Sequence, residues 1–339
     1  MKQNSTRRRR ALLPLMKNAM LASLAPLLGL ASVNSAFAGD TWPSKPLRLI
    51  LPAAPGGSSD PTARLLADEM SKRLGQPIAV LNRPGAGGNI GMAEAARADA
   101  DGYTIVLSWT GPLATNVALY KDLNFSPRKD FAPITKIGCV PNIVAVNKDL
   151  PVASLKDYIE LAKSRPQGIT YGSTGTGSSW HIAGAMIQQE TGATLVHVPY
   201  TSPGVATTDL ISGQLDSMLP LVIMMVPYIN DGKVKGLAVM SNTRSAVLPQ
   251  IPSTKELGMP ELVSDTCFAL LAPKGTPKPV VDKLNAVVND VLNDPKVKER
   301  LEASGITVEG GSTEHLRDYI ESETNRQAEI VRAINAKAG

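Results

Sequence analysis

The chain has 339 residues, of which 43% are hydrophobic, with 35 Lys and Arg against 30 Asp and Glu. Six of the basic residues and none of the acidic ones lie within the first 38 positions, so residues 39–339 carry 29 basic and 30 acidic side chains. This near-neutral balance removes the compositional support for nucleic-acid binding. The 301 residues after position 38 can bury a sizeable core, and their length suits two domains rather than one.

The first 38 residues have the pattern of an export signal. Arg7–Arg10 and Lys17 form a basic start, and residues 19–33 form an apolar stretch. Ala36-Phe37-Ala38 then provides a small-residue cleavage site. An apolar stretch of about 15 residues is shorter than the roughly 20 that span a bilayer. We therefore expect cleavage after Ala38 and a periplasmic mature protein. An uncleaved amphipathic anchor stays open as the alternative, and so does the export route.

After position 38, strand-like and helix-like segments alternate, which is typical of parallel sheets covered by helices. The pattern therefore predicts an α/β fold. Short apolar runs bounded by turn residues predict nine strands, at residues 47–51, 78–81, 103–108, 143–146, 169–171, 195–198, 215–219, 237–240 and 268–271.

The predicted helices begin and end at residues with capping chemistry. The first is predicted to have Asp60 as its N-cap, Pro61 at its first position and Gly75 as its stop. Further helices are predicted at residues 154–165, with Asp157 as capping partner of Ser154, from Pro277, from Pro295, and from Thr313 to about Ile334.

Two glycine-rich turns lie between a predicted strand and a helix start. Their glycines permit positive φ and close approach of a ligand, and the helix start offers free N–H groups and the positive end of its dipole. Such turns predict a site for a small acidic ligand, although a tight turn into a capped helix needs no ligand. Asp60 would repel an anion, so we expect it to cap the helix. The candidate ligand-binding residues here are Pro55, Gly56, Gly57, Ser58, Ser59, Gly85, Ala86, Gly87, Gly88 and Asn89.

A third turn of this kind precedes a helix that is predicted to begin near Trp180. It offers hydroxyls and amides at a further helix start, and its candidate residues are Ser173, Thr174, Gly175, Ser178 and Ser179. The helix dipole disfavours a charged imidazole at His181, so packing or a neutral hydrogen bond is expected there.

Aromatic residues beside these turns bear on the kind of acid. Trp109 follows Ser108 at the end of a predicted strand, and Trp180 opens a helix. If both lined the cleft, they would favour an aromatic or bulky carboxylate through stacking and apolar burial. Packing of one or both beneath the loops is the open alternative. Tyr200 and Ser108 complete the candidate ligand-binding residues.

The two cysteines lie in apolar, strand-like runs. Cys139 falls within residues 137–146 and Cys267 within residues 266–272. A disulfide and a pair of buried thiols both stay open, because the sequence does not supply the distance between the two Cα atoms.

The sequence lacks the residue patterns of common catalytic sites. It contains no G-x-S-x-G elbow and no H-E-x-x-H motif, and His181, His197 and His315 have no metal-ligand spacing. Ser178 or Ser179 beside His181 has no third group to orient the imidazole. We therefore expect no catalysis, no bound metal and no cofactor.

An ordered set of short motifs resembles the substrate-binding receptors of tripartite tricarboxylate transporters, the Bug-type periplasmic binding proteins. It covers residues 42 to about 320. The matching stretches include Trp42-Pro43-Ser44-Lys45-Pro46, Ala54-Pro55-Gly56-Gly57, Asn82-Arg83-Pro84-Gly85-Ala86-Gly87-Gly88-Asn89, Asp101-Gly102-Tyr103-Thr104, His197-Val198-Pro199-Tyr200, Asp209-Leu210-Ile211-Ser212-Gly213-Gln214 and Leu271-Ala272-Pro273-Lys274-Gly275-Thr276-Pro277.

The resemblance implies a two-lobed periplasmic binding protein of a type II-like fold, with the ligand enclosed between the lobes. Residues 1–38 would be the signal peptide, 39–138 with 262–339 the first lobe, and 139–261 the second. The implied function is capture of a small carboxylate and its delivery to integral membrane transporter subunits by a monomer, without nucleic acid. A periplasmic sensor that reports a ligand to a membrane kinase is the alternative, since both functions need a closing cleft.

Overall fold

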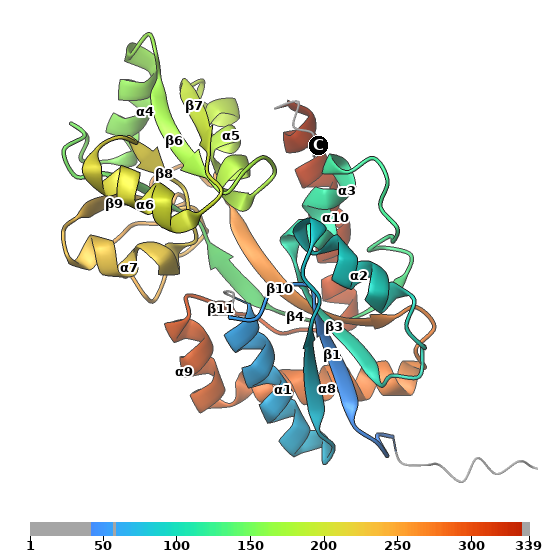
Figure 1. Ribbon diagram of the computed structural model, residues 1–339. Helices are drawn as coiled ribbons and strands as arrows, with labels where there is room; N and C mark the ends of the chain where they lie inside the picture. Colours follow the sequence, from blue (N-terminus) through green and yellow to red (C-terminus); the bar gives the residue numbers. More distant parts are fainter. Residues whose placement is uncertain (1–41, 57–58, 334–339) are drawn as a thin grey trace, which may run out of the picture. The chain divides into compact units, whose positions relative to one another are not determined.

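The computed structural model describes residues 42–56 and 59–333 (Figure 1). The predicted signal peptide lies outside these residues. None of the helices in these ranges combines the length and the apolar character that crossing a membrane requires.

The first lobe is built on a six-stranded sheet in the order β11-β4-β10-β3-β1-β2. Strands β1 and β2 are parallel, as are β1 and β3, whereas β4 and β10 pair in the antiparallel sense. The strands are β1 (Leu47–Leu51), β2 (Ile78–Asn82), β3 (Thr104–Trp109), β4 (Phe131–Pro141), β10 (Asp265–Pro273) and β11 (Thr307–Val308).

Helices before and after these strands complete the first lobe. Helix α1 packs against β2 and α8, while α10 packs against β4 and extends past α3 to contact α5 of the second lobe. The helices are α1 (Asp60–Leu74), α2 (Asn89–Ala96), α3 (Asn116–Leu119), α8 (Lys278–Asn293), α9 (Pro295–Ala303) and α10 (Thr313–Ala333), with short turns of helix η1 (Ala86–Gly88) and η2 (Gly111–Thr115).

The second lobe has a five-stranded sheet in the order β7-β6-β8-β5-β9. Its strands are β5 (Ile143–Asn147), β6 (Ile169–Ser173), β7 (Leu195–Pro199), β8 (Ser217–Met218) and β9 (Val234–Val239). Its helices are α4 (Leu155–Ser164), α5 (Ser179–Thr191), α6 (Pro203–Ser212) and α7 (Val222–Asn230).

Strands β4 and β10 carry the chain between the two sheets (Figure 1). Only Asn142 separates the end of β4 from β5, and β10 returns the chain to the first sheet after β9. Cys139 and Cys267 lie opposite each other on β4 and β10 and are joined by a disulfide, the first of the two alternatives that the sequence left open. The disulfide therefore links the two strands that join the lobes.

Several local predictions are confirmed by the helix ends. Gly75 adopts the left-handed conformation with φ of 70° at the end of α1, and the Ser154 side chain accepts a hydrogen bond from the Asp157 N–H at the start of α4. The prediction for Asp60 is wrong. Ser59 is the N-cap and Asp60 is the first helical residue.

The Asp60 carboxylate closes the preceding turn instead of capping the helix. It accepts hydrogen bonds from the Gly56 N–H, the Asn82 amide and the Arg64 guanidinium. The hydrogen bonds from Arg64 and Asn82 lower the pKa of Asp60 to about 2. The Gly56 N–H that was expected to face an anion is therefore already bound to this carboxylate.

Candidate functional site

A cavity of about 450 Å³ is lined by residues of both lobes. The first lobe contributes Ala53, Ser59, the Gly87 turn, and the segment from Trp109 to Tyr120. The second lobe contributes the loop between β6 and α5, and the floor includes the start of β10. Such a cleft between lobes, at helix starts, is the usual place for a small ligand in an α/β protein.

The turn before α2 has an unusual backbone. Gly85, Ala86, Gly87 and Gly88 all have positive φ, between 48° and 125°. Asn116 holds this turn, because its side-chain amide donates to the Gly87 carbonyl at 3.2 Å and to the Asn89 side chain at 2.7 Å. At the end of the turn, Gly88 in the left-handed conformation is followed by Asn89 in the right-handed one, and such an alternation directs successive backbone N–H groups into an anion-binding concavity.

Trp109 lies against this turn and lines the cavity. A Cβ added at Gly88 would lie 3.1 Å from the Trp109 ring, and one added at Gly111 would lie 2.9 Å from its Nε1. The indole therefore fits between two glycine backbones. Its remaining face is available to the cavity because Trp109 is only partly buried.

The loop between β6 and α5 forms the wall of the second lobe. Ser178 caps α5 by accepting a hydrogen bond from the His181 N–H. The N–H groups of Ser179 and Trp180 belong to the first helical turn, so they have no carbonyl within the helix to accept them. No hydrogen bond within the described chain engages the hydroxyls of Thr174, Thr176 or Ser179. These hydroxyls and the Ser179 N–H are hydrogen-bond donors on the wall of the cavity.

The stacked imidazole rings of His181 and His197 hold the loop between β6 and α5 in place. The rings of His181 and His197 lie 4.1 Å apart between centroids, and the Gly177 N–H donates to His181 Nδ1 at 3.1 Å. Burial, followed by the charge of His197, lowers the pKa of His181 to about 4. His181 is thus neutral at neutral pH and accepts the Gly177 N–H, in agreement with the neutral hydrogen bond that its position in the sequence predicts.

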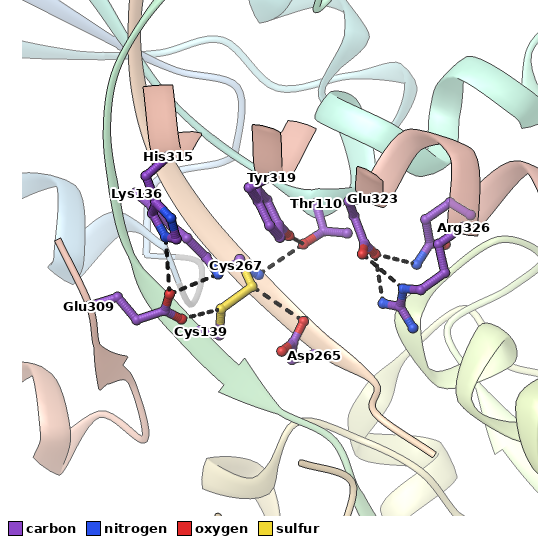
Figure 2. Close-up of a disulfide and its surroundings, with 11 residues drawn as sticks. Thr110, Lys136, Cys139, Asp265, Cys267, Glu309, His315, Tyr319, Glu323 and Arg326 are labelled. Carbon is purple, nitrogen blue, oxygen red and sulfur yellow. Dashed lines mark hydrogen bonds and ion pairs between the residues drawn. A yellow bond between two sulfur atoms is a disulfide. The ribbon is translucent and has the colours of Figure 1, made fainter. Parts of the chain in front are cut away.

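Polar side chains on the floor of the cavity are bound to one another. The Thr110 hydroxyl accepts a hydrogen bond from the Cys267 N–H at 2.9 Å, and the Thr115 hydroxyl donates to the side-chain oxygen Oε1 of Gln327 at 3.0 Å. The Gln327 amide donates in turn to Glu323 at 2.7 Å. These bonds fix η2 and α10 against the strands that join the lobes. Figure 2 shows the adjoining disulfide with Asp265 beside it.

The structure brings some of the predicted site residues to the cavity and places others elsewhere. Six line it: Ser59, Gly87, Trp109, Thr174, Ser178 and Ser179. Gly57 and Ser58 lie outside the described residues. Pro55, Gly56, Gly85, Ala86, Gly88, Asn89, Ser108, Ser173, Gly175, Trp180 and Tyr200 lie outside the lining.

Two of the residues outside the lining have a clear structural role, and a third is buried without one. Trp180 is 5% exposed and packs in the main apolar core. Tyr200 donates from its hydroxyl to Asp209 at 2.9 Å. Ser108 is fully buried, and its hydroxyl has no hydrogen-bond partner in the described part of the chain.

Sequence reasoning missed most of the floor and part of the first-lobe wall. A signal existed for Ser264, Asp265 and Thr266, which form a polar run beside the last predicted strand of the first lobe. No sequence signal marked Gln327 as a site residue, because it lies on an amphipathic helix whose buried face is expected to be apolar. The cavity-lining residues outside the predicted set are Ala53, Thr110, Gly111, Thr115, Asn116, Leu119, Tyr120, Thr176, Gly177, Ile182, Leu221, Ser264, Asp265, Thr266, Phe268 and Gln327.

Comparison with known families agrees with this architecture. The model of the tripartite tricarboxylate transporter family receptor matches residues 62–336. The chain belongs to this family. Its members are substrate-binding receptors and not enzymes, in line with the lack of catalytic motifs in the sequence.

Individual members of the receptor family are similar over nearly the whole chain. Protein BugT of Bordetella pertussis is 34% identical over 94% of this chain and 98% of its own length. A solved structure of R. palustris Rpa4515 with adipate is 32% identical, covers 88% of this chain and all of its own, and has a TM-score of 0.76. MatC from Rhodopseudomonas palustris with bound malate is 31% identical over 86% of this chain and 100% of its own, with a TM-score of 0.71.

Proposed function

We propose that this receptor captures a small organic carboxylate in the periplasm and delivers it to the membrane subunits of a tripartite tricarboxylate-type transporter. The observation that carries the proposal is the cavity between the lobes, whose walls combine the Gly87 turn with the hydroxyls and backbone amides of residues 174 and 176–179. The structures of two family members with adipate and with malate support a carboxylate as ligand. The export signal supports the periplasm.

Backbone amides and hydroxyls would hold the carboxylate oxygens in this cavity. Lys, Arg and His are absent from the described residues of its lining, so the carboxylate would be bound by oriented dipoles and not by a cation. Closure of the lobes around the ligand would exclude water from these hydrogen bonds and form the surface that the membrane subunits recognise.

A thermal unfolding screen tests this function directly. Purified protein beginning at residue 39, freed of bound ligand, would be heated with aliphatic, aromatic and amino-acid carboxylates. A ligand at about 100 times its Kd stabilises the folded state by about 2.7 kcal/mol, which raises the melting temperature by several degrees. The absence of a shift with every carboxylate, confirmed by calorimetric titration, would contradict a carboxylate receptor.

Trp109 supports the finer proposal of an aromatic or bulky carboxylate. Its partly exposed ring lines the cavity and offers a face for stacking. Trp109→Ala should weaken binding of an aromatic acid such as benzoate by roughly 10-fold and that of succinate by much less, because a stacked aromatic pair contributes about 0.5–1.5 kcal/mol beyond its buried area. Isothermal titration calorimetry measures both affinities.

Trp180→Ala is the matched control for this comparison. It removes the same side chain from the apolar core, so it should destabilise the fold and reduce the affinities for both acids by the same factor. Equal losses for the two acids in Trp109→Ala as well would argue that Trp109 only packs beneath the loop.

A further inference from the structure

Asp265 is the one charged side chain among the described residues that line the cavity. It begins β10, next to the strand crossing and the disulfide (Figure 2). Its Oδ1 lies 3.2 Å from the Cys267 Sγ, but a disulfide sulfur has no hydrogen to donate. Within the described chain, no N–H or O–H group and no cation is paired with this carboxylate. The lining of the cavity thus includes an acidic residue whose carboxylate has no hydrogen-bonded or ion-paired partner in the described part of the chain.

The neighbouring cations are engaged with other carboxylates. Arg326 on α10 is paired with Glu323 at 2.7 Å and donates to the Val263 carbonyl at 2.8 Å. Lys136 on β4 is paired with Glu309 at 2.9 Å and lies 4.2 Å from the centroid of the Tyr319 ring.

Each of these two ion pairs presents Asp265 with one positive and one negative charge. Glu323 and Glu309 disfavour its charged form, while Arg326 and Lys136 favour it. Burial is the largest influence and raises the pKa of Asp265 to about 6. Above that pH the carboxylate is charged beside the proposed carboxylate site, and a cationic group of the ligand lying between the two charges would relieve their repulsion.

We propose that Asp265 determines the specificity of the cavity by binding a protonated nitrogen of the ligand, so that the preferred ligand is a zwitterion with an ammonium or similar cation and a carboxylate. This inference rests on the proposed carboxylate-receptor function. The carboxylate would lie toward the Gly87 turn and the start of α5, where the donors gather, and the cationic nitrogen would lie toward β10. Repulsion by Asp265 would exclude a dicarboxylate of the same length from the same orientation.

Pairs of ligands of equal length in which only one member carries an ammonium group test the role of Asp265. Adipate and 6-aminohexanoate form one such pair, and succinate with aspartate forms a pair that differs by an added amino group. At about pH 8 the wild-type protein should bind the amino member of each pair at least roughly 10-fold more tightly. Asp265→Asn keeps the shape and removes the charge, so it should weaken the amino member by roughly 10-fold or more and leave the dicarboxylate unchanged or tighter.

The pH dependence of the wild-type protein gives an independent readout without any substitution. Protonation of Asp265 removes its repulsion of a second carboxylate and adds an O–H donor. The affinity for adipate should therefore rise, and that for 6-aminohexanoate should fall, as the pH is lowered from about 8 to about 5.5. In Asp265→Asn the ratio of the two affinities should not change with pH.

Asp282→Asn is the control for a change of charge outside the cavity. Asp282 is an exposed member of an ion pair with Lys278 on α8, and its substitution should leave both affinities unchanged. The inference is overturned if carboxylates bind but Asp265→Asn changes neither the ratio within each pair nor its pH dependence. Failure of every carboxylate to bind would instead remove the proposed function and this inference with it.

Discussion

Gly87→Val should weaken ligand binding by roughly 100-fold while the protein remains folded. Gly87 has a φ of 63°, a conformation that costs an L-amino acid about 1–2 kcal/mol and a β-branched one more. A Cβ at this position would lie 3.4 Å from both the Asn116 amide and the Tyr120 hydroxyl, so the valine methyl groups would enter the cavity between them. The turn would then have to change its backbone, and its N–H groups would move with it.

Gly232→Val separates the loss of the site from the cost of the backbone conformation. Gly232 has a φ of 67°, and no atom lies within 4 Å of the Cβ that a substitution would add. Both variants should lose a similar free energy of unfolding, and only Gly87→Val should lose affinity in calorimetric titration. Equal affinities in the two variants would show that the Gly87 turn does not contact the ligand.

Replacing both cysteines by alanine should lower the free energy of unfolding by about 2–5 kcal/mol. The disulfide joins residues 128 positions apart, and a cross-link over so long a loop removes much of the conformational freedom of the unfolded chain. Cys139 and Cys267 are also buried, so the substitution removes some packing as well. A fall in melting temperature of roughly 5–10 °C is expected by calorimetry.

Reduced wild-type protein is the control for the disulfide. Reduction under unfolding conditions, followed by refolding with the thiols blocked from oxidation, removes the cross-link and keeps the sulfur atoms in place. If the cross-link is the main source of stability, the reduced protein and Cys139→Ala/Cys267→Ala should melt at similar temperatures. A double variant as stable as the oxidised protein would contradict this account.

Local patterns predicted most of the secondary structure, because short-range interactions decide it. Pro61 and Gly75 mark the ends of α1, and the Ser154–Asp157 pair caps α4. Strand β4 shows the limit of such patterns, because only its end, from residue 137, lies in a run that the sequence marks as strand-like. Pro133, Lys136 and Gly138 interrupt its apolar run, yet it forms a strand because β10 pairs with it along its whole length.

The two tryptophans show the same limit at the site. Trp109 and Trp180 both lie next to a glycine-containing turn at the start of a helical segment, so their sequence positions predict the same role. Packing separates them, since the indole of Trp109 lies against Gly88 and Gly111 at the cavity and that of Trp180 is enclosed by the core. Which face of a turn meets a neighbouring lobe is a property of the assembled fold.

The α/β class and the turns that lead into the helices could be predicted from the sequence alone, and the receptor family could be recognised from the resemblance of its ordered motifs. The class and the turns depend on residue types at fixed short spacings, which act through capping, φ preference and the periodicity of apolar residues. The pairing of Cys139 with Cys267, and the place of Asp265 in the cavity lining without a partner among the described residues, became visible only in the folded structure. Both depend on contacts between residues far apart in the chain, and such contacts exist only once the two lobes have packed around the strands that join them.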